Sequence, residues 1–173
     1  MKEAIQTLIT SDKMAHAFEY LKQDEAHTID QQIELVQISS FSPFEEKRAI
    51  RFKELLTEAG LDPVMDEVHN VYAHIHGTGN GPTLYVSAHL ETVFPPETPL
   101  PVKREGTKIY APGIGDDTRG LAEILTLART IKESGLKPVG DIIIGGNVGE
   151  EGLGDLRGMR HFFSKNADKV DGF

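Results

Sequence analysis

The stretch from residue 141 to residue 148, DIIIGGNV, constrains the fold of this chain more than any other segment. A strand with one solvent-exposed face alternates apolar and polar residues. The apolar residues here follow one another without that alternation, so the segment predicts a strand buried on both faces. Such a strand needs a layer of structure on each side of its sheet. We therefore expect a layered α/β domain in which helices cover a sheet.

Helical patterns dominate the first third of the chain. Residues 2–23 carry apolar residues at helical spacing, with a possible break at Ser11-Asp12. A second helix is expected to begin at Thr28, because Gln31 three residues later completes a capping box.

A third helix has stronger start and stop signals. Ser42 is its expected N-cap, Pro43 takes the first helical position, and Glu45 closes the capping box. A glycine at position 60 should end this helix in a left-handed conformation. The expected buried face comprises Phe52, Leu55, Leu56 and Ala59.

Strands and further helices follow in an order typical of α/β proteins. Strands are expected at residues 63–68, 71–76, 83–88 and 141–148, a hairpin at 102–111, and helices from 118 to about 135 and around 155–165. The proline-rich stretch 94–101 should have no regular structure. The last residues, KVDGF, look like the beginning of another strand.

Composition narrows the classes of function. The 173 residues include 27 acidic and 18 basic side chains, a net charge of −9, which disfavours general nucleic-acid binding. Without cysteine, any metal must be held by histidine and carboxylate. No apolar stretch is suited to a signal peptide or a membrane span, so we expect a cytoplasmic protein with no membrane partner.

Three groups of polar residues carry the chemistry. His89 and Glu91 follow the strand at 83–88, Asp116-Asp117 precedes a helix, and Glu150-Glu151 follows the strand at 141–148. Each group alone is explained at least as well by a helix cap or a solvated turn. Ligands of α/β sheets bind beyond the carboxyl ends of the strands, so we expect the groups to meet there. An imidazole with several carboxylates suits zinc, manganese or cobalt.

The other histidines receive ordinary interpretations. His74 and His76 alternate along a strand and are expected to face solvent, although their spacing resembles a pair of metal ligands. The remaining four, at positions 16, 27, 69 and 161, lie in expected helices or turns without a partner pattern.

The motifs SAHLETVFP at 87–95, GIGDDTRG at 113–120 and GEEG at 149–152 resemble those of the co-catalytic zinc peptidases. That family includes peptidase T, carboxypeptidase G, acetylornithine deacetylase, succinyl-diaminopimelate desuccinylase and aminoacylase. The resemblance covers about residues 27–173. It implies a three-layer α/β/α sandwich of the zinc-exopeptidase type and hydrolysis of an amide bond in a small peptide or an N-acyl amino acid.

The resemblance also implies a role for each matching residue. His89 resembles the ligand of one zinc, Asp116 the carboxylate that bridges two zinc ions, and Glu151 the ligand of the other zinc. Asp117 is the alternative to Asp116 if the alignment is displaced by one position. Glu150 resembles the general base that takes a proton from the attacking water and passes it to the leaving nitrogen.

One residue departs from the family pattern. Members usually carry aspartate two positions after the ligand histidine, where this chain has Glu91. The resemblance gives this carboxylate the task of orienting the His89 ring. Glutamate is longer by one methylene, so we expect metal binding or activity to be weaker by ~10–100-fold, the range for groups that support metal ligands.

Length is the second departure, because family members are about twice as long. They carry another acidic ligand, a late histidine ligand and an inserted lid domain that often forms homodimers. We therefore expect residues 1–173 to be the N-terminal portion of the catalytic domain, truncated at its C-terminus and with little activity alone.

Two other functions remain open at this point. A non-catalytic remnant would bind peptides or partner chains in the same cleft without hydrolysing them. A magnesium-dependent phosphotransfer domain would use Asp116-Asp117, but no lysine, serine or threonine is placed to hold a phosphate.

Overall fold

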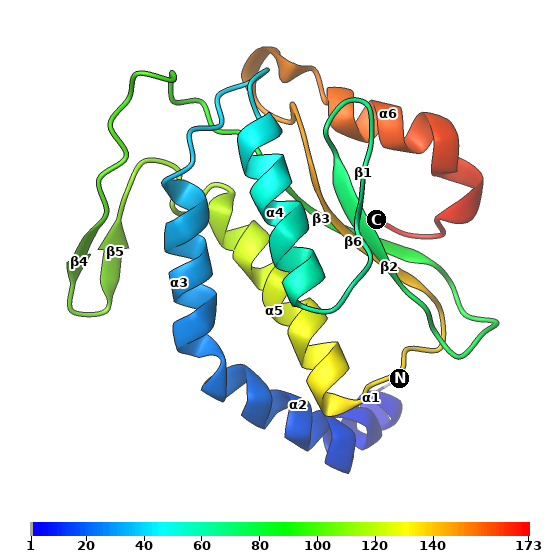
Figure 1. Cartoon of the computed structure of the whole chain (residues 1–173). Coiled ribbons are helices and arrows are strands. Elements are labelled where there is room, and N and C mark those ends of the chain that lie inside the picture. The colour runs from blue at the N-terminus through cyan, green and yellow to red at the C-terminus, as the bar shows by residue number, and fades with distance from the viewer. Residues whose placement is uncertain (1) are drawn as a thin grey trace.

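The computed structural model describes residues 2–173, whose elements appear in Figure 1. Six α-helices, six strands and two short 3-10 helices occur in this part of the chain. Their order is α1 (Lys2–Ile9), α2 (Asp12–Gln23), α3 (Glu25–Val36), α4 (Glu46–Glu58), β1 (Val64–Met65), β2 (Val71–Ile75), β3 (Leu84–His89), β4 (Lys103–Glu105), β5 (Lys108–Tyr110), α5 (Thr118–Ser134), β6 (Ile142–Asn147), η1 (Gly152–Gly154), α6 (Arg157–Asn166) and η2 (Ala167–Lys169).

The main sheet has the strand order β1-β2-β6-β3. Strands β3 and β6 are parallel, with His89 opposite Asn147, whereas β2 runs antiparallel to both β1 and β6. The parallel pair brings the carboxyl ends of β3 and β6 to the same edge of the sheet. Strands β4 and β5 form the separate hairpin expected at residues 102–111.

Helices cover both faces of this sheet, as Ile143 and Ile144 of β6 show. Ile144 packs in a core cluster with residues of α4 and α5, while Ile143 packs on the other face with Met159 and Phe162 of α6. In Figure 1, α4 and α5 lie against one side of the strands and α6 lies apart from them. The prediction of a strand buried on both faces of a layered α/β domain is confirmed.

The first two helices agree with the sequence pattern. The chain breaks between α1 and α2, where the Ser11 hydroxyl accepts a hydrogen bond from the Met14 N–H at 3.4 Å. Several of their large apolar side chains are exposed, namely Ile5, Leu8, Ile9, Phe18 and Leu21. None of the helices within residues 2–173 has both the length and the apolar character that crossing a membrane requires.

The predicted start of the second helix is wrong. Helix α3 begins at Glu25 rather than Thr28, and the Thr28 hydroxyl donates backwards to the Asp24 carbonyl at 3.1 Å. The reason is a buried polar cluster between helices. Asp24 accepts hydrogen bonds from Arg129 of α5, and the hydroxyls of Thr28 and Thr126 lie 2.6 Å apart. Thr28 is therefore a buried contact of the helix interior and not its cap.

The predicted capping box of α4 is also wrong. The helix begins at Glu46, and the Ser42 hydroxyl accepts a hydrogen bond from Arg157 of α6 at 2.9 Å instead of capping α4. The peptide bond between Ser42 and Pro43 is cis, and the fully buried Glu45 carboxylate also binds Arg157. Contacts with α6 thus replace the local cap.

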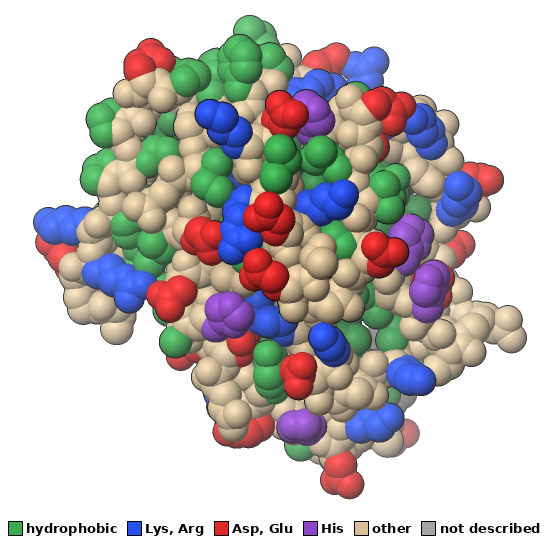
Figure 2. Space-filling model, viewed as in Figure 1, with side chains coloured by type: hydrophobic (Ala, Val, Ile, Leu, Met, Phe, Trp, Pro, Cys, Tyr) green, Lys and Arg blue, Asp and Glu red, His purple; other side chains and the backbone are tan. Residues whose placement is uncertain are grey.

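The end of α4 and its packing agree with the sequence. The core cluster that faces the sheet contains all four residues expected on its buried side: Phe52, Leu55, Leu56 and Ala59. Gly60 has a φ of 86°, the left-handed conformation expected of a terminating glycine. On the outer surface of α4, Arg51 pairs with Glu34, Glu54 and Glu58. Figure 2 shows acidic and basic side chains interspersed on this face of the molecule.

The remaining elements lie close to their predicted positions. The turn between β1 and β2 contains His69, whose φ is 75°, and α5 ends at Gly135 with a φ of 63°. Residues 94–101 form no helix or strand. Near the end of the chain, Gly172 forms a parallel bridge with Leu84 and accepts the Tyr85 N–H at 2.9 Å, in agreement with the expected extended backbone.

Arg48 of α4 joins the loop after α3 to the end of β3. Its fully buried guanidinium donates to the Ile38 carbonyl at 3.1 and 2.6 Å and to the Leu90 carbonyl at 2.9 Å. Burial lowers the pKa of Arg48 to about 10, while the nearby charge of Glu91 acts in the opposite direction.

We expect Arg48→Met to lower the free energy of unfolding by ~2–4 kcal/mol, because buried carbonyl groups lose their donors. Urea denaturation measures the change. Lys47→Met is the matched control, since Lys47 is exposed on the same helix. Its expected effect is within ~0.5 kcal/mol. Equal unfolding midpoints for the two variants would contradict the role assigned to Arg48.

Candidate metal centre

Three predicted site residues converge at the carboxyl ends of β3 and β6. His89 is the last residue of β3, Asp116 lies in the loop before α5, and Glu151 follows β6. Each offers one ligand atom, and these atoms lie within 4.8 Å of one another. It is the only group of this kind formed within residues 2–173. The parallel pairing of β3 and β6 explains the convergence of His89 and Glu151.

The hydrogen bonds of the His89 ring show which of its nitrogens is available to a metal ion. Nδ1 lies 3.1 Å from the Glu91 carbonyl oxygen, which can only accept, so we assign the ring hydrogen to Nδ1. In the neutral ring, Nε2 then carries a lone pair, and it faces Oδ1 of Asp116 at 3.0 Å. Two acceptors at that distance repel each other unless a proton or a metal cation lies between them. The cluster therefore fits a divalent cation.

The electrostatics of the cluster point the same way. Burial lowers the pKa of His89, but Glu91, Asp116 and the carboxylates around them raise it, and the net change is upward. Burial raises the pKa of Glu151, and the negative charges of Asp116, Glu91 and Glu150 act in the same direction. Negative charge thus raises the pKa of His89 and adds to the effect of burial at Glu151, and a bound cation would neutralise this charge.

Asp117 has a different task from Asp116. Its Oδ1 accepts the Gly120 N–H at 3.2 Å at the start of α5, and its Oδ2 accepts the His89 main-chain N–H at 3.1 Å. The Asp116-Asp117 peptide bond is cis. Asp117 therefore joins α5 to β3, while the exposed Asp116 side chain reaches the His89 ring. Burial raises the pKa of Asp117.

Glu91 is bound differently from what the resemblance implies. Its carboxylate lies 3.6 Å from Nδ1 of His89, and the hydrogen bond of the ring goes to the Glu91 carbonyl instead. The carboxylate is fully buried and accepts the main-chain N–H groups of Gly149 and Glu151, each at 2.8 Å, and that of Glu150. The Glu91 side chain thus binds the loop that follows β6. The weaker metal binding expected from Glu91 stays a prediction.

The last candidate, Glu150, lies between Gly149 and Glu151, whose main-chain N–H groups both bind Glu91. Its main-chain N–H binds Glu91, and its side chain is exposed next to Glu151. Solvent therefore reaches the Glu150 carboxylate.

The structure leaves the other histidines outside this cluster. His74 on β2 and His76 just after this strand are exposed, with their rings stacked 5.9 Å apart, and His76 lies 3.2 Å from Asp141. His27 pairs with Asp24, and His161 lies 3.3 Å from Glu67. The solvated positions expected for His74 and His76 are confirmed.

Three residues that position the strand ends near the cluster were not predicted from the sequence. The side chain of Asn70 accepts the Val148 N–H at 3.1 Å and donates to the Gly158 carbonyl at 3.0 Å, which joins the end of β6 to α6. Arg48 and Arg157 act similarly near the ends of β3 and β6. Their partners lie far away in the chain, so no local motif could reveal them.

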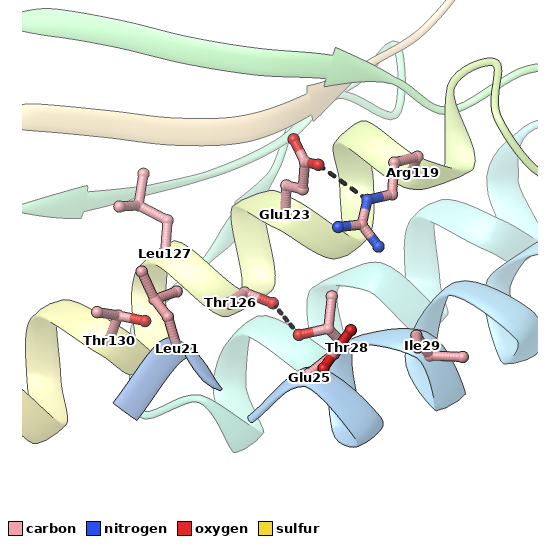
Figure 3. A pocket seen from close by; sticks show the side chains of 9 residues that line it. All are labelled: Leu21, Glu25, Thr28, Ile29, Arg119, Glu123, Thr126, Leu127 and Thr130. Carbon is pink, nitrogen blue, oxygen red and sulfur yellow. Dashed lines mark hydrogen bonds and ion pairs between the residues drawn. The ribbon is translucent and has the colours of Figure 1, made fainter. Parts of the chain in front are cut away.

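Two hollows adjoin the cluster and share Val93 and Glu151. One has a volume of about 470 Å³ and lies toward residues 41–43 and 152–157, and the other has about 270 Å³ and lies toward residues 111–116. A third hollow of about 390 Å³ lies between α2, α3 and α5 (Figure 3). Its Glu123 is paired with Arg119 at 2.8 Å, and none of the three clustered residues lines it.

Comparison with known proteins places the chain in a family. The model of peptidase family M20/M25/M40 matches residues 85–173, which include all three clustered residues. The chain belongs to this family of peptidases. The resemblance seen in the sequence and the three-layer α/β/α class that it implies are confirmed.

Individual relatives are peptidases by name. Over 84 residues the chain is 37% identical to carboxypeptidase G2 of Pseudomonas sp. (strain RS-16). This match covers 47% of this chain and 20% of that protein. A Staphylococcus aureus tripeptidase superposes with a TM-score of 0.60 at 30% identity, covering 73% of this chain and 37% of that one. Aminopeptidase PepT of Bacillus cereus superposes with a TM-score of 0.61 at 26% identity. The superposition covers 71% of this chain and 36% of that one. The chain thus matches well under half the length of these relatives.

We expect Glu91→Gln to release the loop at residues 149–151. An amide in place of the carboxylate turns an N–H₂ group toward one of the main-chain N–H donors, so at least one hydrogen bond is lost. The expected result is faster hydrogen exchange of the Gly149, Glu150 and Glu151 amides and a loss of ~1–3 kcal/mol in unfolding free energy.

Glu97→Gln controls for the change of charge, because Glu97 is exposed in the proline-rich loop. NMR-detected exchange compares both variants with the unmodified chain. If the three amides exchange at the same rates in all three proteins, the Glu91 carboxylate does not hold this loop.

Proposed function

We propose that this chain carries part of the active site of a zinc-dependent peptidase or N-acyl amino acid deacylase that cleaves an amide bond next to a free terminus. The convergence of His89, Asp116 and Glu151 in a member of a peptidase family is the observation that carries this proposal. The relatives named carboxypeptidase, tripeptidase and aminopeptidase support small peptides as the substrate class.

The residues of the cluster have separate tasks in this reaction. Nε2 of His89 and the carboxylates of Asp116 and Glu151 would hold the ion. A bound zinc supplies Lewis-acid polarisation of the substrate carbonyl and lowers the pKa of water. The carboxylate of Glu150 accepts the proton of the attacking water and returns it to the leaving nitrogen. Glu91 keeps Glu150 and Glu151 in place through their main-chain N–H groups.

Metal titration tests the ligand assignment. We expect about one zinc per chain, because one group of ligands converges within residues 2–173. Glu151→Gln should weaken zinc binding by more than the ~10–100-fold typical of residues that only support ligands. Glu150→Gln should bind zinc like the unmodified chain, since its role is proton transfer.

Isothermal titration of zinc into the metal-free proteins measures the zinc dissociation constant of the unmodified chain and of each variant. Cobalt absorption is a second readout. Glu97→Gln again controls for removal of one acidic group. The assignment is wrong if Glu151→Gln and Glu97→Gln bind zinc equally well, or if the unmodified chain binds none.

We expect the 173-residue chain alone to hydrolyse di- and tripeptides slowly or not at all. Family members use two zinc ions, whereas the three ligands found within residues 2–173 lie in one group. A sensitive amine-release assay, with Glu150→Gln as the blank, measures this rate. Fast turnover that Glu150→Gln abolishes would show that the described residues already form a complete site. Zinc binding without turnover agrees with the expectation, and peptide binding without any zinc would favour the non-catalytic alternative.

A further inference from the structure

The hollow of about 470 Å³ beside Glu151 differs in character from the metal cluster. Its walls include the apolar side chains of Phe41, Pro43, Val93 and Leu153. Glu151 belongs both to this wall and to the metal cluster, so the hollow is continuous with the site where the amide bond would be cleaved.

Of the three charged residues that line this hollow, Glu151 belongs to the metal cluster and the other two are already paired. The Arg157 guanidinium binds the Ser42 hydroxyl at 2.9 Å and the buried Glu45 carboxylate. The Glu91 carboxylate is buried and accepts three main-chain N–H groups. The lining therefore offers no free cation to an acidic side chain, and burying a charged group there without a partner would be costly.

Two apolar side chains at the hollow are unusually exposed. Leu153 is fully exposed, and Val93 is about half exposed. Leu153 lies in η1 between Gly152, with a φ of 58°, and Asp155, with a φ of 54°. This turn holds the Leu153 side chain away from the core. An apolar group bound in the hollow would remove the side chains of Leu153 and Val93 from water.

We infer that this hollow is the subsite for an apolar side chain of the substrate residue next to the cleaved bond. The inference rests on the proposed function, because Glu151 connects the hollow to the metal cluster. The smaller hollow on the other side of Val93 and Glu151 gives a peptide room to lie across the cluster. Leu153 and Val93 select the side chain by contact, and the paired Arg157 gives no preference for an acidic one.

A binding experiment on the metal-free chain tests this assignment separately from catalysis. The protein is labelled with ¹³C at the leucine and valine methyl groups and titrated with L-leucinamide, glycinamide and L-glutamic acid α-amide. All three carry the same amide and ammonium groups, so differences in affinity report the side chain. We expect L-leucinamide to bind ~10–100-fold more tightly than glycinamide and to shift the Leu153 and Val93 methyl signals.

Variants at exposed positions complete the test. Leu153→Ala should remove most of the preference for L-leucinamide, and its exposure means that folding is unaffected. Leu8→Ala is the matched control, an exposed leucine on α1. Equal affinity for the three amides would overturn the inference. So would ligand-induced shifts of the Leu127 methyl signals, in the hollow between α2, α3 and α5, in place of shifts at Leu153 and Val93. Failure of zinc binding with an intact leucine preference would contradict the proposed function alone.

Discussion

The buried carboxylate of Glu91 is the interaction on which the rest of the site depends. It lies just beyond β3 and accepts three consecutive main-chain N–H groups from the segment that follows β6. The carbonyl of the same residue accepts Nδ1–H of His89. One residue thus sets the orientation of the His89 ring and the position of Glu151. Removing a carboxylate from water is unfavourable, and the three N–H donors compensate for part of that cost.

Long-range bonds between side chains and the main chain extend this arrangement to the helices. Arg48 holds the Leu90 carbonyl next to Glu91, Asn70 holds the Val148 N–H next to Gly149, and Asp117 holds the His89 N–H. Each joins a strand end to another element. The ligand atoms are therefore supported by rigid elements, although Asp116 and Glu151 themselves lie in loops, and this support is what a metal site requires.

Much of the fold was predictable, because α5 and β6 carry strong local signals. The apolar face of α5, the left-handed Gly135 and the unbroken apolar run of β6 lie where the sequence pattern puts them. The starts of α3 and α4 were not predictable in the same way. Asp24, Ser42 and Glu45 bind Arg129 and Arg157 more than 100 residues away, and these contacts override local capping preferences. The site residues were found through family motifs, whereas the actual bonds of Glu91 became visible only in three dimensions.

Anomalous diffraction from crystals of the zinc-loaded chain shows directly whether His89, Asp116 and Glu151 hold the ion. Data collected on both sides of the zinc absorption edge locate the ion independently of any assumed ligand. We expect a zinc peak within bonding distance, ~2.0–2.2 Å, of Nε2 of His89 and of carboxylate oxygens of Asp116 and Glu151. A zinc peak elsewhere, for example at the exposed His74 and His76 pair, with none at this cluster, would contradict it.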